Sequence, residues 1–249
     1  MALLKVDRIY KSFQGFLALG GVSLQVQERT FHALVGPNGA GKTTLFNVVT
    51  GRLVPDQGRV FFRGAEITGW STPKVARLGI AIAFQRAQPF ASMTVLEAVV
   101  LARLGYTGQT FRLLRPLSAF PEAQAKAQAA LAKVGLEAHA MRRVAELPLG
   151  DLKRLDVAMA LVAEPEILLL DEPLAGLSRA ERRRMVDFIG DLLRREGVTL
   201  LFTEHDTEAV LALADRVTVL HQGRVLAEGT PEEIRGDSAV RAAFLGGGA

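Results

Sequence analysis

The chain has 249 residues, a formal net charge of +4 and no cysteine. This length suits one α/β domain with an inserted subdomain, and the lack of cysteine excludes disulfide scaffolds, thiolate metal sites and thiol nucleophiles. Aromatic residues make up 6% of the chain, and none interleaves the arginine clusters such as Arg182 to Arg184. We therefore expect solvated helix faces and no nucleic-acid partner.

The segment from about residue 3 to residue 63 is predicted to form short strands around one glycine-rich loop. Val22, Leu24 and Val26 alternate with polar residues, which is the period of a half-buried strand. Charged residues interrupt the apolar N-terminal stretch, and nowhere do 18 uncharged apolar residues run together. We expect neither a secretion signal nor a transmembrane segment.

The glycine-rich segment follows the apolar stretch Phe31–Val35 and precedes a helix predicted to begin at Thr44. A strand, such a loop and a helix form the context that the P-loop, or Walker A, pattern requires. Backbone N–H groups would bind phosphates, Lys42 would reach the β and γ phosphates, and Thr43 would ligate magnesium. The residues predicted to contact nucleotide here are Gly36, Pro37, Asn38, Gly39, Ala40, Gly41, Lys42, Thr43 and Thr44.

From about residue 93 to residue 163 the pattern becomes helical, and α/β alternation then returns. The later elements are predicted as a strand Ile167–Leu170, a helix Arg179–Arg195, a strand Val198–Thr203 and a helix from Asp206. The alternation indicates a parallel sheet and an α/β P-loop fold with an N-terminal antiparallel β subdomain. We predict a core lobe of residues 1–85 and 164–249 and a helical lobe of residues 86–163.

Asp171 and Glu172 end the apolar strand, at the edge where open α/β sheets bind ligands. Asp171 is predicted to orient magnesium. Glu172 is predicted to position the attacking water as a base near the γ-phosphate. The only asparagines, Asn38 and Asn47, are not followed by lysine, so the Asn-Lys-x-Asp guanine reader is absent and GTP is disfavoured.

A long helical segment separates Lys42 from Asp171, and with this order of motifs almost the whole chain resembles the ABC transporter ATPases. The resemblance implies that Phe13 stacks on adenine, although a core aromatic is the alternative. It implies that Gln85, which closes the strand from Ile80, touches magnesium and links the ATP site to the membrane subunit. It also implies that His205 contacts the γ-phosphate as a switch.

The ABC signature Leu-Ser-Gly-Gly-Gln appears here as Leu147–Asp151, without the serine and the glutamine. In the family this segment begins a helix that binds the γ-phosphate on the opposite subunit, which implies that role for Gly150 and Asp151. Pro148 replaces the serine, and its restricted φ suits the first turn of a helix. The loop Ala175–Ser178 also lacks the family's usual aspartate.

These departures resemble the LivG-type ATPases of branched-chain amino-acid importers, and sibling urea, amide and lipopolysaccharide transport ATPases share much of the pattern. The resemblance implies a peripheral, ATP-hydrolysing subunit on the cytoplasmic face of the inner membrane. A homodimer or heterodimer of such subunits would close on Mg-ATP and drive membrane permease subunits, with a solute-binding protein as an indirect partner. A soluble ABC ATPase of assembly or repair, and a regulatory nucleotide binder, are the alternatives.

Overall fold

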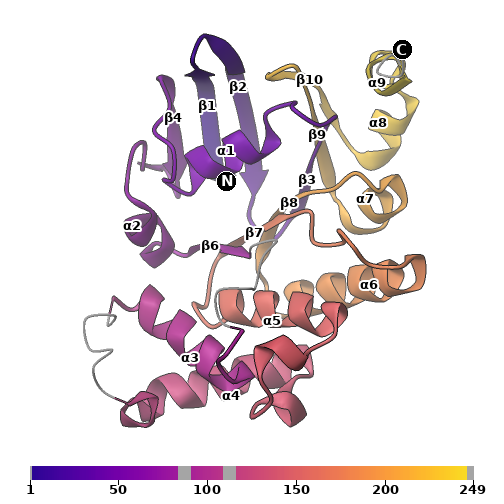
Figure 1. The fold of residues 1–249 in the computed structure, drawn as a ribbon. Coiled ribbons are helices and arrows are strands. Elements are labelled where there is room, and N and C mark those ends of the chain that lie inside the picture. The colour runs from indigo at the N-terminus through magenta and orange to yellow at the C-terminus, as the bar shows by residue number, and fades with distance from the viewer. Residues whose placement is uncertain (1, 84–90, 109–115, 246–249) are drawn as a thin grey trace. The chain divides into compact units, whose positions relative to one another are not determined.

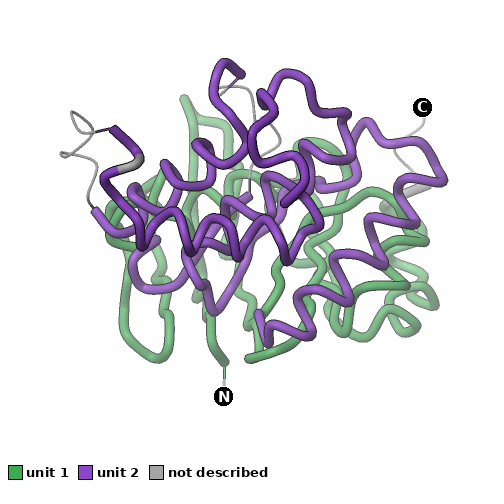
Figure 2. The backbone as a smooth tube through the Cα atoms, turned by 90° about the horizontal axis from the view of Figure 1, so that it is seen from below, with its two compact units in different colours: residues 1–75, 199–249 green, residues 76–198 purple. Residues whose placement is uncertain are grey.

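The structure is a computed structural model that describes residues 2–83, 91–108 and 116–245. It contains two compact units, coloured separately in Figure 2. Unit 1 comprises residues 1–75 and 199–249, and unit 2 comprises residues 76–198. This division differs from the lobes expected from the sequence, whose boundaries at residues 85 and 164 remain a prediction.

Unit 1 contains an antiparallel sheet with the strand order β2-β1-β4-β5 (Figure 1). Its strands are β1 (Ala2–Phe13), β2 (Phe16–Gln27), β4 (Gln57–Phe62) and β5 (Ala65–Glu66). Alternating apolar residues such as Val22, Leu24 and Val26 are buried, as the period of two predicts. The expected antiparallel β subdomain is present in the structure.

The other strands of unit 1 run in the order β10-β9-β3-β8. They are β3 (Phe31–Val35), β8 (Thr199–Thr203), β9 (Arg216–His221) and β10 (Arg224–Gly229). β3 pairs in parallel with β8 and with β9, and β10 runs antiparallel to β9. Every residue of β3 and β8 is buried, as expected for parallel strands that are covered on both faces.

The helices of unit 1 begin where the chain supplies a suitable cap or turn. They are α1 (Lys42–Val49), α7 (Thr207–Leu213), α8 (Pro231–Gly236) and α9 (Ser238–Leu245), while α2 (Thr72–Arg77) crosses the boundary between the units. Thr230 and Glu233 form a capping box at α8, and the carboxylate of Asp206 accepts hydrogen bonds at the start of α7. α1 begins at Lys42, so the predicted start at Thr44 was two residues late.

Unit 2 contains the parallel pair β6 (Ile80–Ala83) and β7 (Ile167–Asp171), with Ile80 opposite Ile167. Its α-helices are α3 (Val95–Tyr106), α4 (Pro121–Val134), α5 (Leu149–Leu161) and α6 (Arg179–Arg195). Short 3-10 turns occupy Leu117–Ala119, Glu137–His139 and Val144–Glu146. The helical character expected from residue 93 onward is therefore confirmed for the described residues of that segment.

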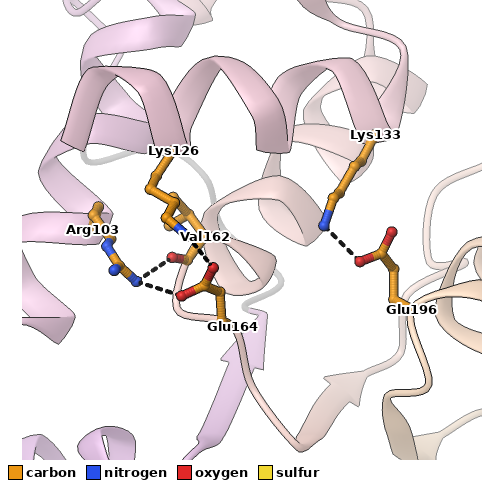
Figure 3. A network of polar contacts seen from close by, with 6 residues as sticks. All are labelled: Arg103, Lys126, Lys133, Val162, Glu164 and Glu196. Carbon is orange, nitrogen blue, oxygen red and sulfur yellow. Dashed lines mark hydrogen bonds and ion pairs between the residues drawn. The ribbon is translucent and has the colours of Figure 1, made fainter. Parts of the chain in front are cut away.

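Polar contacts join the helices of unit 2 (Figure 3). Arg103 Nη1 on α3 donates to the carbonyl oxygen of Val162 at 2.9 Å, and both Arg103 and Lys126 on α4 pair with the carboxylate of Glu164. The hydrogen bond from Lys126 lowers the pKa of Glu164. Arg103 is mostly buried, but Lys126 and the shared partner Glu164 are exposed, so these ion pairs contribute little each. Apolar packing therefore carries most of the stability of this helical region.

In the described ranges, the structure has no helix that combines the length and the apolar composition needed to span a membrane.

Candidate functional site

The glycine-rich loop connects β3 to α1 within unit 1, and its glycines have distinct structural reasons. A Cβ at Gly36 would lie 2.2 Å from the carbonyl oxygen of Leu220, and one at Gly41 would lie 2.7 Å from that of Ala18. Gly39 has a φ of 79° and open space around it. Two glycines thus let the loop pack closely against its surroundings, and the third opens it toward solvent.

Lys42 and the start of α1 form the cationic part of this loop. Lys42 is 6% exposed, and its Nζ donates hydrogen bonds to the carbonyl oxygens of Gly36 at 2.6 Å and Pro37 at 3.1 Å. No side chain caps α1, and its first turn carries no acidic residue. Thr43 is exposed beside it. The loop therefore has the backbone donors and the positive potential that a phosphate group requires.

His205 and its neighbours follow β8 at the sheet edge where the glycine-rich loop follows β3. The two strands are parallel and Leu34 lies opposite Thr203, so both loops emerge at the same edge. His205 is exposed, and its backbone N–H donates to the carboxylate of the buried Glu204 at 3.2 Å. The structure thus places His205 on the phosphate-loop side of unit 1, as its predicted role requires.

Phe13 ends β1 and pairs with Phe16 across the hairpin. Its side chain is 42% exposed, and Lys11 Nζ lies 5.8 Å from the ring centroid. Phe13 is not a core residue, so the alternative considered from the sequence is wrong. An exposed ring is available for stacking on a base, which remains the prediction for this residue.

Asp171 and Glu172 lie at the C-terminal end of β7 in unit 2, both half-buried. Glu172 has a φ of 49°, a left-handed conformation that is uncommon for a residue other than glycine. The backbone carbonyl of Glu172 accepts a hydrogen bond from the N–H of Ala175 at 3.1 Å, which closes the following turn. Six other described non-glycine residues share this conformation, so it does not identify a functional residue, and the role of Glu172 remains a prediction.

The altered signature begins α5, as the family resemblance implies. Pro148 is the N-cap, with φ −64° and ψ 158°, and the first helical residue is Leu149. Pro148 therefore lies one position before the first turn of the helix, for which its restricted φ is suited. Pro148 supplies no side-chain cap, and a Cβ at Gly150 would meet nothing within 4 Å. The helix start is open at Gly150, while Asp151 places a carboxylate in the first turn.

The loop Ala175–Ser178 lies against this helix start, within the same unit. A Cβ at Gly176 would lie 3.1 Å from Cδ2 of Leu149. A hollow of about 290 Å³ is lined by Pro148, Gly150 and Asp151 from the signature and by Leu177 from the loop, among others. The two segments in which this sequence departs most from its family pattern are therefore neighbours in the structure.

α5 also contains two charged residues that the sequence reasoning missed. Lys153 is buried and Asp156, one turn later, is half-buried. Burial raises the pKa of Asp156 to about 7, and the charge of Lys153 opposes this shift. Their spacing of three residues places both on one helix face, which is the signal that pattern analysis of α5 could have used.

The structure does not describe every predicted site residue, and it divides the described ones between two units. Gln85 lies outside the described residues. The phosphate loop and His205 belong to unit 1, whereas the acidic pair and the signature belong to unit 2. The described part of the chain contains no group of three or more His, Cys, Asp or Glu side chains that could hold a metal ion. Assembly of these parts into one ATP site remains a prediction.

Comparisons with known families and structures agree with these features. The family "ABC transporter" matches residues 19–175, and "Branched-chain amino acid ATP-binding cassette transporter" matches residues 224–249. The "High-affinity branched-chain amino acid transport ATP-binding protein LivG" of Salmonella typhimurium (strain LT2) is 41% identical over 98% of each chain. The corresponding protein BraF of Pseudomonas aeruginosa is 37% identical, also over 98% of each chain.

Solved structures show the same relationship. A nucleotide-free ATP-binding cassette from an ABC transporter superposes with a TM-score of 0.90 at 30% identity, covering 98% of this chain and 99% of that one. The ADP conformation of MJ1267, another ATP-binding cassette, gives 0.87 at 31% identity and covers 99% of each. The chain belongs to the ABC transporter family, as one of its nucleotide-binding, ATP-hydrolysing subunits.

Proposed function

We propose that this chain is the ATPase subunit of an importer for branched-chain amino acids. Two observations support the proposal. Relatives named for branched-chain amino acid transport match this chain along nearly their whole length, and the branch-specific family matches residues 224–249. The substrate itself would not touch this chain, because ATPase subunits of this family act on separate membrane proteins. The solute assignment therefore depends on the branch to which the chain is similar.

The observation that carries the ATPase role is the phosphate loop, with Lys42 folded over it and an uncapped helix behind it. In this proposal Gly36 to Thr44 bind the phosphates and Phe13 stacks on adenine. Glu172 activates the attacking water, and His205 contacts the γ-phosphate. Gly150 and Asp151 contact the nucleotide of a second subunit.

Magnesium would be held by the Thr43 hydroxyl, the Asp171 carboxylate and Gln85. These oxygen donors suit Mg²⁺, which is commonly bound through one or two carboxylates together with substrate phosphates and water. The exposure of Thr43 and the place of Asp171 at a strand end fit this donor set. When bound, the ion would neutralise charge on the β and γ phosphates.

The proposed partners are a second ATPase subunit and membrane permease subunits, with the complex at the cytoplasmic face of the inner membrane. To test this, the chain is co-expressed with the membrane proteins encoded beside it, purified as a complex and reconstituted into vesicles. ATP-dependent uptake of leucine, isoleucine and valine supports the proposal when Lys42→Ala abolishes it. Uptake of urea or short amides instead would show that the chain serves a urea or amide transporter. No co-purifying membrane protein would favour a soluble ATPase.

The altered signature favours a second candidate, a nucleotide-binding subunit that depends on a more regular partner. Pro148 gives its helix start no side-chain cap, and Asp151 adds a negative charge beside the expected phosphate position. ATPase activity of the chain alone, compared with the complete complex, separates the two candidates. Turnover of the isolated chain equal to that of the complex would exclude the dependent role.

A further inference from the structure

The signature helix α5 directs two charged side chains toward the interior of unit 2. Lys153 is 8% exposed, and Asp156 lies one turn further along the same face. A buried charge is costly unless it is paired or hydrogen-bonded. Within residues 2–83, 91–108 and 116–245, no hydrogen bond or ion pair satisfies the carboxylate of Asp156. A small polar ligand that is not part of the chain would satisfy it.

A cavity of about 20 Å³ adjoins these residues. Its polar lining consists of Lys153, Asp156 and Asp171, the last residue of β7. Its apolar lining comes from Pro173, which follows β7, and from β6, β7, α5 and α6, through Ala83, Leu170, Val157, Met185 and Ile189. One water molecule needs about 10 to 15 Å³ and two or more polar partners, so this cavity fits a single water.

We propose that Asp156 is a positioning residue that, together with Lys153, holds one water in this cavity and through it orients the carboxylate of Asp171. The inference rests on the proposed function of Asp171 as a magnesium ligand. Groups that hydrogen-bond to a metal ligand set the orientation and basicity of that ligand. Asp156 lines the same cavity as Asp171, so it can act on Asp171 in this way through the water. The signature helix and the acidic strand are then linked within one subunit.

The test compares two replacements of Asp156 in the full chain. Asp156→Leu keeps the branching at Cγ but removes both polar atoms, whereas Asp156→Asn keeps the shape and a hydrogen bond to water. The readout is the Mg²⁺ concentration that gives half of the metal-dependent gain in affinity for a fluorescent, non-hydrolysable ATP analogue. Asp156→Leu should raise this concentration about tenfold. Asp156→Asn should stay near wild type, and affinity without metal should be unchanged in both.

Asp187→Leu is the matched control. Asp187 lies on α6, exposed, between the cavity-lining residues Met185 and Ile189. The same change there should leave the Mg²⁺ dependence at its wild-type value. Lys153→Met provides a second route, in case Asp156→Leu fails to fold, because it removes another partner of the water and should act in the same direction.

Asp171→Asn distinguishes failure of the proposed water link from failure of the magnesium role of Asp171. If Asp171→Asn weakens the Mg²⁺ dependence while Asp156→Leu and Lys153→Met match wild type, the water link is wrong and the role of Asp171 stands. If Asp171→Asn also leaves the Mg²⁺ dependence unchanged, Asp171 is not a magnesium ligand, and the inference about Asp156 is wrong as well. An equal effect of Asp187→Leu and Asp156→Leu would overturn the inference as well, since the effect would not depend on the cavity.

Discussion

The two compact units contribute to the predicted ATP site by different means. In unit 1 the phosphate loop is constrained by its backbone, with close approaches at Gly36 and Gly41 and a helix end that no side chain caps. In unit 2 the acidic pair and the signature helix depend on charged side chains, and its described non-glycine residues in the left-handed conformation are Glu164 and Glu172. Backbone N–H groups held in a fixed loop suit phosphate binding, whereas charged side chains in fixed positions suit catalysis of the hydrolysis step.

In each unit, burial shifts the pKa of a titratable group, and the two shifts have opposite consequences for stability. His32 in unit 1 is fully buried, and burial, with the charge of Arg216, lowers its pKa to about 4. Burial raises the pKa of Asp156 in unit 2 to about 7. The neutral form is favoured in both cases. The contribution of His32 is lost toward acid pH, while that of Asp156 is lost as the pH rises toward 7.

The largest effect is expected from a variant that tests whether unit 2 contributes to ATP hydrolysis and not only to ATP binding. Glu172→Gln keeps the shape of the side chain and the same backbone requirements but removes the base. ATP turnover should fall by at least about a hundredfold, while nucleotide affinity stays near wild type. Steady-state ATPase assays and equilibrium binding of an ATP analogue measure the two. Glu137→Gln, on an exposed turn of the same unit, is the control. Turnover at the wild-type rate would remove Glu172 from the mechanism.

The buried histidine of unit 1 gives the next largest effect. His32 Nε2 hydrogen-bonds Thr218 Oγ1 at 2.8 Å, and its Nδ1 has no partner among the described residues. The folded-state pKa of about 4 lies below the unfolded value of 6.5, so this stability is complete above pH 6.5. It is lost as the pH falls to about 4, and the loss amounts to about 3 kcal/mol.

Urea unfolding between pH 7.5 and pH 4 measures this loss. His32→Gln should flatten the acid side of the stability profile, because glutamine does not titrate. His221→Gln makes the same change at a half-buried position of β9 and should retain the loss. An unchanged acid profile in the His32 variant would show that its burial does not control the acid sensitivity of the fold.

Lys42→Ala tests the phosphate binding that the loop of unit 1 is expected to provide. Removing a charged donor to phosphate should weaken ATP binding by about 1.5 to 3 kcal/mol, or about ten- to a hundredfold. The two carbonyl oxygens that accept hydrogen bonds from Lys42 Nζ would also lose their partner, which loosens the loop. Isothermal titration with ATP measures the change, and Lys74→Ala, at an exposed lysine of unit 1, is the control. Unchanged affinity would refute the phosphate-loop assignment.

Local sequence features explain which elements were predicted with their exact ends. The strand Phe31–Val35 is a short apolar run followed directly by glycine, and Arg179–Arg195 begins after a capping box of Ser178 and Glu181. Both elements have the predicted bounds. The start of α1 was misplaced because the phosphate-binding Lys42 is itself the first helical residue, and no cap marks that position.

Features that depend on distant neighbours were not predictable from the pattern. The left-handed Glu172 has no residue-type signal, because glutamate rarely adopts this conformation. The polar cavity at Asp156 is lined by residues of β6, β7, α5 and α6, and β6 is far from the other three in sequence. The exposure of Phe13 likewise depends on which surfaces cover the end of the β1 hairpin. Local preference cannot specify such contacts.

The smallest expected effect concerns Pro148, where unit 2 departs from its family pattern. Serine is preferred at an N-cap because its hydroxyl can accept a hydrogen bond from the N–H of the third helical residue, here Asp151. In Pro148→Ser the hydroxyl would either make this cap or donate to a phosphate of the opposite subunit. Only the phosphate contact favours the closed dimer, because the cap forms equally in the free subunit. The cap instead stabilises the folded subunit, against a small loss of the restriction that proline gives the unfolded chain. The net gain should be below about 1 kcal/mol, less than tenfold in dimer affinity.

Pro148→Ala separates the hydroxyl from the backbone change, since it loses the proline ring without gaining a polar atom. Sedimentation of both variants on a Glu172→Gln background, with and without Mg-ATP, gives the dimerisation constants. The hydroxyl acts on phosphate if serine strengthens dimerisation over alanine only with Mg-ATP present. It acts as a helix cap if serine instead raises thermal stability over alanine without nucleotide. If serine dimerises no more tightly than proline, Pro148 is adapted to this branch. Phosphate recognition would then depend on Gly150 and the N-terminus of α5, where no side chain fills the space.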